Sequence, residues 1–287
     1  MSTQRKALCV GVNQYRNFPQ ATLRGCVPDA RAMSTVLKDL YGFDSRDIGV
    51  LLDADATKAN ILNQVKEMIA GAKVGKYNQL VFTMSSHGTQ TPDQVHEEDD
   101  TFDEAFCPHD LLWAGTKWDP NHVILDDELH DLFVQVPSNV ELEVFLDTCH
   151  AGTGLKAFDL QPTRKVRYLP PPSFEAFKQV ENRRPRGLAH RLLEKGVQNH
   201  ILWAACRADQ PSAEDLFGRE FHGAFTNYLV KEMRKDTQQT RAQLLRNVRT
   251  QLGTAGYSQI PQLETEATKR HLASIPVPGM EQVPVGV

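Results

Sequence analysis

The most constraining feature of this sequence is the alternation of short apolar runs with segments of helical periodicity. Short apolar runs between polar residues are typical of buried strands, and they lie at 7–12, 48–52, 80–84, 142–146 and 201–205, with a late strand near 263. Apolar residues recur at helical spacing over 28–42, 57–71, 126–136, 224–233 and 242–252. Strands that alternate with helices predict an α/β fold, with a mostly parallel sheet and helices on both faces.

The composition is that of an ordinary globular protein. The chain has 287 residues, 40% hydrophobic and 24% charged, which allows one large domain or two small ones. Its net charge of -4 favours neither nucleic acid nor an anionic membrane. No apolar stretch approaches 18 residues, and the five cysteines are far apart without a CxxC pair. We therefore expect a soluble, cytoplasmic protein without nucleic-acid or membrane partners.

Two predicted strands end on reactive side chains. The strand at 80–84 leads to His87, which precedes Gly88, and the strand at 142–146 leads to Cys149. The carboxyl ends of parallel strands meet at one sheet edge, so a thiol and an imidazole would face each other there as nucleophile and base. The alternative for each residue alone is a buried structural cysteine or histidine. Finding both at neighbouring strand ends favours the reactive pair.

Five segments, in order along the chain, resemble the caspase-like cysteine peptidases of the metacaspase type, including bacterial orthocaspases. They are LRGCVPDA (23–30), SSHGTQ (85–90), DTCHAG (147–152), AACRADQPSAE (204–214) and GAFTNYL (223–229). The resemblance implies a caspase-like three-layer sandwich around a six-stranded sheet, and endopeptidase activity without an organic cofactor. It also implies that His87 and Cys149 form a catalytic dyad. The backbone N–H groups of Gly88 and Cys149 would stabilise the oxyanion.

The same resemblance implies a substrate pocket for a basic side chain. Its residues would be Cys26, Asp29, Ser85 and Asp147. Two carboxylates beside a slot attract Arg or Lys and repel acidic side chains, so we expect protein or peptide substrates with Arg or Lys before the cut. Asp29 has an alternative role as an acid at a helix start.

An acidic stretch suggests a calcium site. Residues 93–104 hold seven carboxylates in twelve positions, and Asp126 and Asp127 add two adjacent acids. Calcium prefers six to eight oxygen ligands, and the resemblance implies that Asp100, Asp103, Asp126 and Asp127 bind it. The alternatives are a solvated acidic loop and the first turn of a helix.

A basic, proline-rich connection divides the chain. Residues 155–199 contain ten Lys or Arg, four Asp or Glu and five Pro, which is typical of an exposed loop. We expect a large catalytic subdomain at 1–155, a linker at 156–199 and a small subdomain at 200–287. An enzyme that cuts after Arg or Lys could cut this linker, and the candidate sites are Arg164, Lys165, Arg167, Arg183, Arg184 and Arg186. The alternative is a solvated basic loop.

Four positions depart from the family pattern, and none belongs to the dyad: Pro28, Thr101, Thr148 and Ala151. Pro28 could shift the pocket wall, and Thr101 could alter the acidic loop. Two other functions stay open: a caspase-like scaffold that no longer cuts, and a peptidase specific for Asp or an uncharged residue. We expect a monomer.

Overall fold

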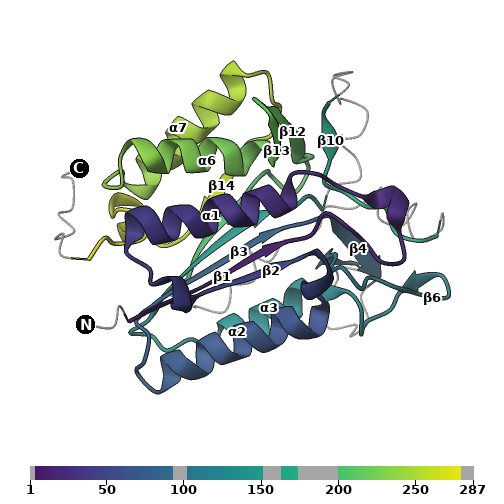
Figure 1. The fold of residues 1–287 in the computed structure, drawn as a ribbon, viewed down its shortest axis with the longest axis horizontal. Coiled ribbons are helices and arrows are strands. Elements are labelled where there is room, and N and C mark those ends of the chain that lie inside the picture. The colour runs from purple at the N-terminus through teal and green to yellow at the C-terminus, as the bar shows by residue number, and fades with distance from the viewer. Residues whose placement is uncertain (1–3, 93–101, 151–162, 174–199, 279–287) are drawn as a thin grey trace.

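A six-stranded sheet forms the middle of the molecule (Figure 1). The computed structural model describes residues 4–92, 102–150, 163–173 and 200–278. The strand order is β14-β11-β9-β3-β1-β2, parallel throughout except for β14 at one edge. The bounds are β1 Arg5–Gly11, β2 Ile48–Leu52, β3 Gln79–Ser85, β9 Glu141–Asp147, β11 His200–Ala204 and β14 Gln262–Glu264.

Helices cover both faces of this sheet and confirm the three-layer α/β sandwich. In Figure 1, α1, α6 and α7 lie on the upper face, and α2 and α3 on the lower. Their bounds are α1 Cys26–Tyr41, α2 Lys58–Lys73, α3 Asp126–Phe133, α6 Ala224–Lys235 and α7 Arg241–Thr254. Among the described residues, no helix is both long and apolar enough to span a bilayer.

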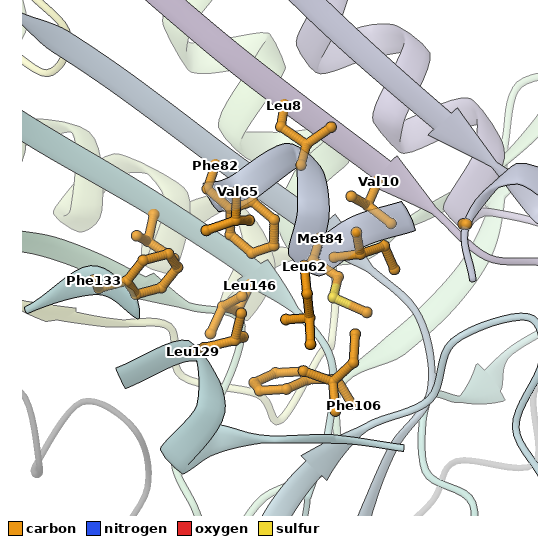
Figure 2. Close-up of a cluster of buried hydrophobic side chains, with 14 of the residues drawn as sticks. Leu8, Val10, Leu62, Val65, Phe82, Met84, Phe106, Leu129, Phe133 and Leu146 are labelled. Carbon is orange, nitrogen blue, oxygen red and sulfur yellow. The ribbon is translucent and has the colours of Figure 1, made fainter. Parts of the chain in front are cut away.

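Alternation along each strand separates two hydrophobic cores. On β1, Leu8 and Val10 belong to the core under α2 and α3, whereas Ala7 and Cys9 belong to the core under α1 and α6. Successive side chains of a strand point to opposite faces, so a strand covered on both sides is apolar throughout. Figure 2 shows the first core, in which Leu8, Val10, Phe82 and Met84 meet Leu62 and Val65 of α2.

Local signals explain where the helices begin and end. The Thr57 side chain accepts a hydrogen bond from the backbone N–H of Asn60 and caps α2. Helix α1 ends at Tyr41, and the next residue, Gly42, has a φ of 67°, in the left-handed region that favours glycine. The expectation that the third helix continues to Val136 is wrong, because α3 ends at Phe133. The residue before Pro137 disfavours helical geometry, so turns close this segment.

Several short elements were not expected from the sequence. The short strands are β4 Gly88–Pro92, β5 Phe102–Phe106, β6 Trp113–Ala114, β7 Lys117–Trp118, β8 Ile124–Leu125, β10 Lys165–Val166, β12 Ala213–Phe217 and β13 Glu220–Gly223. The 3-10 turns are η1 Pro19–Ala21, η2 Ser45–Asp47, η3 Asp53–Asp55 and η5 Thr268–His271. Two three-stranded sheets, β4-β5-β8 and β10-β12-β13, flank the carboxyl edge of the main sheet.

A buried carboxylate joins the sheet to the carboxyl-terminal segments. Glu143 on β9 is fully buried and accepts hydrogen bonds from Arg241 Nη2 at 2.9 Å and Trp203 Nε1 at 2.8 Å. Ser274 Oγ and the backbone N–H of Ile275 also donate to it, at 2.7 and 3.1 Å. Buried charges are tolerated only when they are paired, so Arg241 on α7 is essential to this cluster.

Replacing Arg241 should therefore destabilise the fold strongly. Arg241→Met leaves the Glu143 charge buried without a cation, which typically costs roughly 3–5 kcal/mol of the free energy of unfolding. Urea unfolding measures the change, with Arg246→Met, an exposed arginine on the same helix, as the control. Equal stabilities of the two variants would contradict this account.

Candidate active site

The register of β3 and β9 places the two predicted reactive residues side by side. Ser85 is paired with Asp147, so His87 and Cys149 each lie two residues beyond the same pair. A side chain at Gly88 would collide with the carbonyl of Cys149, which shows how closely the two strand ends approach. His87 and Cys149 therefore follow adjacent strand ends at one edge of the sheet, as expected.

Hydrogen bonds fix the His87 ring in one orientation. Nε2 lies 2.8 Å from the carbonyl oxygen of Ala21 in η1. A carbonyl only accepts, so Nε2 carries the hydrogen and the buried Nδ1 carries the lone pair. The Tyr15 hydroxyl accepts from the backbone N–H of His87 at 2.8 Å. Burial, together with the smaller effect of the Lys165 and Arg167 charges, lowers the pKa of His87 to about 4, so the ring is a neutral proton acceptor at pH 7.

The Cys149 thiol lies among polar groups at the same edge. It is buried, and its Sγ donates to the carbonyl oxygen of Gln210 at 3.4 Å. Cys206 is also buried, and it hydrogen-bonds to the Cys149 side chain, which raises the pKa of Cys206. His150 is engaged elsewhere, with Nε2 3.1 Å from Thr148 Oγ1. His87 is therefore the better placed base.

Two of the predicted pocket acids converge beside this edge. Asp29, in the first turn of α1, accepts from the backbone N–H of Gly223 and from His222 Nδ1, both at 3.0 Å. Asp147, at the end of β9, accepts from Thr226 Oγ1 at 2.7 Å and Ser212 Oγ at 2.9 Å. Burial raises the pKa of Asp29, and the nearby Arg167 opposes this rise.

A third acid, Glu214, was not expected from the sequence. Its carboxylate is buried on β12 and accepts from the backbone N–H groups of Arg24 and Gly25 at 2.9 and 3.0 Å. The segment 204–214 was recognised as a family motif, but its final residue was not singled out. Its alignment in an antiparallel hairpin with β13 is what brings it to the pocket.

The guanidinium of Arg167 fills the space between the three acids. Nη2 lies 2.7 Å from Asp29 Oδ2 and 3.7 Å from Glu214 Oε2, and Nη1 lies 3.2 Å from Asp147 Oδ1. The Arg167 side chain has 0% exposure, so the expectation of an exposed linker is wrong here. Burial lowers its pKa, but the surrounding acids outweigh burial and hold the pKa well above its ordinary value.

The other two predicted pocket residues are also buried in this region. Cys26 begins α1, and its pKa, raised by burial, is lowered in part by the Arg167 charge. Ser85 is paired with Asp147, and its carbonyl accepts from the backbone N–H of Val12 at 3.0 Å. Gly223 is a further pocket residue, because a side chain there would collide with Asp147 and Arg167.

Three of the four predicted calcium ligands lie on neighbouring elements of the fold. Asp103 is on β5, and Asp126 and Asp127 begin α3, directly after the strand β8 that pairs with β5. Asp103 and Asp126 are buried carboxylates, which fit the oxygen chemistry of calcium. Asp100 lies outside the described residues, and within the described ranges no group of three metal-ligating side chains is present. The calcium site stays a prediction.

The remaining linker candidates have other partners or fall outside the described residues. Arg164 Nε donates to Asp215 Oδ2 at 3.0 Å, and Lys165 Nζ donates to the carbonyl of Thr22. The candidates outside the described residues are Arg183, Arg184 and Arg186. The subdomain boundaries proposed from the sequence stay predictions.

Comparison with known proteins decides the family. The caspase domain model matches residues 4–272. The chain belongs to the caspase family. Metacaspase-1A of Aspergillus oryzae is 30% identical over 96% of this chain and 71% of its own length. Metacaspase-1 of Emericella nidulans is 31% identical over 91% of this chain and 70% of its own length. These matches confirm the metacaspase resemblance and a cysteine-type endopeptidase.

Two solved structures share the fold of this caspase-family member. A protein from Geobacter sulfurreducens superposes with a TM-score of 0.63 at 20% identity, over 90% of this chain and 92% of that one. Caspase-1 from Spodoptera frugiperda superposes with a TM-score of 0.60 at 14% identity, over 92% of this chain and 87% of that one. At these identities the likeness concerns the architecture alone.

The lowered pKa of His87 predicts a loss of stability in acid. Between the ordinary value of 6.5 and about 4, the unfolded chain binds a proton that the folded chain does not. The free energy of unfolding is therefore highest above pH 6.5 with respect to this group, and it falls by roughly 3 kcal/mol as the pH approaches 4. In urea unfolding at pH 7 and 4.5, His87→Gln should lose less stability than the wild type. An identical loss would contradict the assigned pKa.

Proposed function

We propose that this caspase-family peptidase cuts polypeptides after Arg or Lys, with Cys149 as nucleophile and His87 as base. The observation that carries the proposal is the pocket of Asp29, Asp147 and Glu214, which accommodates a complete guanidinium beside Gly88 and Cys149. Three buried carboxylates attract a cation and repel an acidic side chain. An uncharged side chain would leave these charges buried without a partner.

The proposed chemistry uses the chain's own groups. His87 Nδ1 takes the Cys149 proton, and the thiolate attacks the backbone carbonyl carbon of the substrate Arg or Lys. The N–H groups of Gly88 and Cys149 would stabilise the resulting oxyanion. The C–N bond breaks, and His87 gives its proton to the leaving amine. Water, activated by His87, then hydrolyses the thioester and regenerates the thiol.

The test is a set of fluorogenic peptides that differ only in the residue before the cut. Arg and Lys peptides should be turned over, whereas Asp and Leu peptides should not. Cys149→Ala should abolish turnover, and Cys9→Ala, another buried cysteine in the core below α1, should retain it. Equal rates for Arg and Asp peptides would overturn the specificity. Absence of turnover of every peptide in the set would favour a silent scaffold.

We also propose that calcium stimulates the enzyme through Asp103, Asp126 and Asp127, with Asp100 as a further ligand. The support is the connection of these acids to the oxyanion donor. Asp103 is at one end of β5, and the other end of β5 pairs with Gly88 on β4. A cation that neutralises the buried acids would hold this hairpin, and with it the Gly88 N–H, in place.

Removal of calcium should therefore lower peptide turnover. Initial rates with an Arg peptide should rise at least several-fold when calcium is added after chelation. Asp126→Asn should lose this response, and Asp131→Asn, an exposed acid on the same helix, should keep it. An unchanged rate after chelation would contradict the calcium proposal without affecting the dyad.

A further inference from the structure

A cavity of about 400 Å³ lies between α1 and α6, which are neighbours on the upper face of the sheet (Figure 1). Its walls come from these two helices and from the strand β13. Neither His87 nor Cys149 lines it, so it is separate from the dyad. A volume of this size is typical of a site for one small molecule.

Two arginines reach this cavity from different helices. Arg31 of α1 and Arg234 of α6 both line it, and both side chains are exposed. Among the described residues, neither guanidinium has a hydrogen-bonded or ion-paired partner. A guanidinium binds phosphate or carboxylate through a planar pair of N–H groups. Two unpaired guanidiniums at one cavity therefore favour an anionic ligand.

His222 adds a third group that can carry positive charge. Its Nδ1 lies 3.0 Å from Asp29 Oδ1, and its Nε2 lies 3.5 Å from Glu220 Oε2. Burial lowers the pKa of His222, as does the charge of Arg167, but the Asp29 hydrogen bond and the charges of Asp29 and Glu220 outweigh them and raise the pKa. Glu220 is the single acid in the lining, so the cavity has a net positive charge.

The rest of the lining suits the body of a small organic molecule. Pro28 and Ala32 of α1 and Val230 of α6 supply apolar surface, and Asn227 adds an amide. Ligand pockets typically combine apolar walls with a few charged groups that fix the orientation. A phosphate monoester carries roughly two negative charges at pH 7, which matches the two arginines better than the single charge of a carboxylate. The lining therefore favours a small organic phosphate.

Two residues of the cavity wall also hold the acids of the substrate pocket. His222 bonds to Asp29, and Thr226 Oγ1 donates to Asp147 Oδ2 at 2.7 Å. The other oxygens of the two acids face the guanidinium of Arg167 in the pocket. A ligand that orders this wall would fix the acids in place, and its negative charge would add to theirs. Each effect strengthens the attraction of the pocket for a cation.

We propose that the cavity between α1 and α6 binds a small organic phosphate through Arg31 and Arg234, and that the bound phosphate increases the affinity of the substrate pocket for Arg and Lys. The binding site stands on the cavity alone, whereas its effect on substrate affinity rests on the proposed function. The two effects are reciprocal, because a ligand that favours substrate binding is itself bound more tightly when substrate is present.

Isothermal titration calorimetry of the full-length protein tests the site, with adenosine 5′-monophosphate and glucose 6-phosphate as probes. At least one of these phosphates should bind at one site per chain. The tighter of the two shows whether the cavity prefers a nucleoside or a sugar as the organic part. Adenosine and glucose are the matched controls without phosphate, and neither should bind.

Two arginine variants locate the site. Arg31→Gln and Arg234→Gln should each weaken binding of the tighter phosphate roughly tenfold or more, because each removes a charge-assisted contact. Both side chains are exposed, so neither substitution should unfold the protein. Arg219, an exposed arginine in the turn before β13, does not line the cavity, so Arg219→Gln should bind as the wild type does. Equal affinity of all four proteins, or no binding of either phosphate, would overturn the site.

Steady-state kinetics with an Arg peptide test the effect on the substrate pocket. The tighter phosphate, at saturation, should lower the KM of the wild type roughly fivefold or more and change kcat by less than about twofold. The KM of Arg234→Gln should not respond, whereas that of Arg219→Gln should. Phosphate binding without a change in KM would overturn this effect and leave the proposed function standing. If no Arg peptide is turned over, the proposed function and the effect both fail, and the titration still decides the site.

Discussion

The burial of one guanidinium among three carboxylates is the interaction on which the site depends. Arg167, Asp29, Asp147 and Glu214 are all withdrawn from water. Unpaired charges in such a place would cost several kcal/mol each, so the pocket requires a cation. The chain's own arginine provides one in this structure, and we propose that a basic substrate side chain can provide it instead. The stability of the fold and the proposed affinity for a basic substrate then have one physical origin.

The fold brings these charges together from distant parts of the chain. Asp29 is at the start of α1, Asp147 at the end of β9 and Glu214 on β12. The parallel register of β3 and β9 adds the imidazole and the thiol at the same edge. The hairpin β12-β13 and the strand β4 then form the two sides between which an extended peptide lies. A rigid sheet therefore positions groups that are carried on the segments beyond its strands.

The sequence predicted the main sheet and the neighbouring strand ends that precede His87 and Cys149, because those features depend on local patterns. Apolar runs at 48–52 and 142–146 are strands within a residue of the expected bounds, and His87 and Cys149 follow strands that are indeed neighbours. The resemblance to the metacaspases added Asp29 and Asp147 as expected residues of the substrate pocket. Each of these inferences needs only a motif or a periodicity in one segment.

The state of the linker could not be predicted in this way. A basic, proline-rich composition is typical of solvated loops, and nothing near Arg167 in the sequence reports the acids that surround it. Its burial depends on carboxylates 138 and 20 residues upstream, at Asp29 and Asp147. Glu214 was missed for the same reason, because its partners Arg24 and Gly25 are 190 and 189 residues away.

A crystal structure of the Cys149→Ala chain tests the central claim most directly, because this variant lacks the proposed nucleophile and cannot cut any peptide. The account predicts electron density for the Arg167 guanidinium between Asp29 and Asp147, with the Arg167 carbonyl on the Gly88 N–H. A pocket that holds only solvent, with residues 163–173 placed elsewhere, would contradict it.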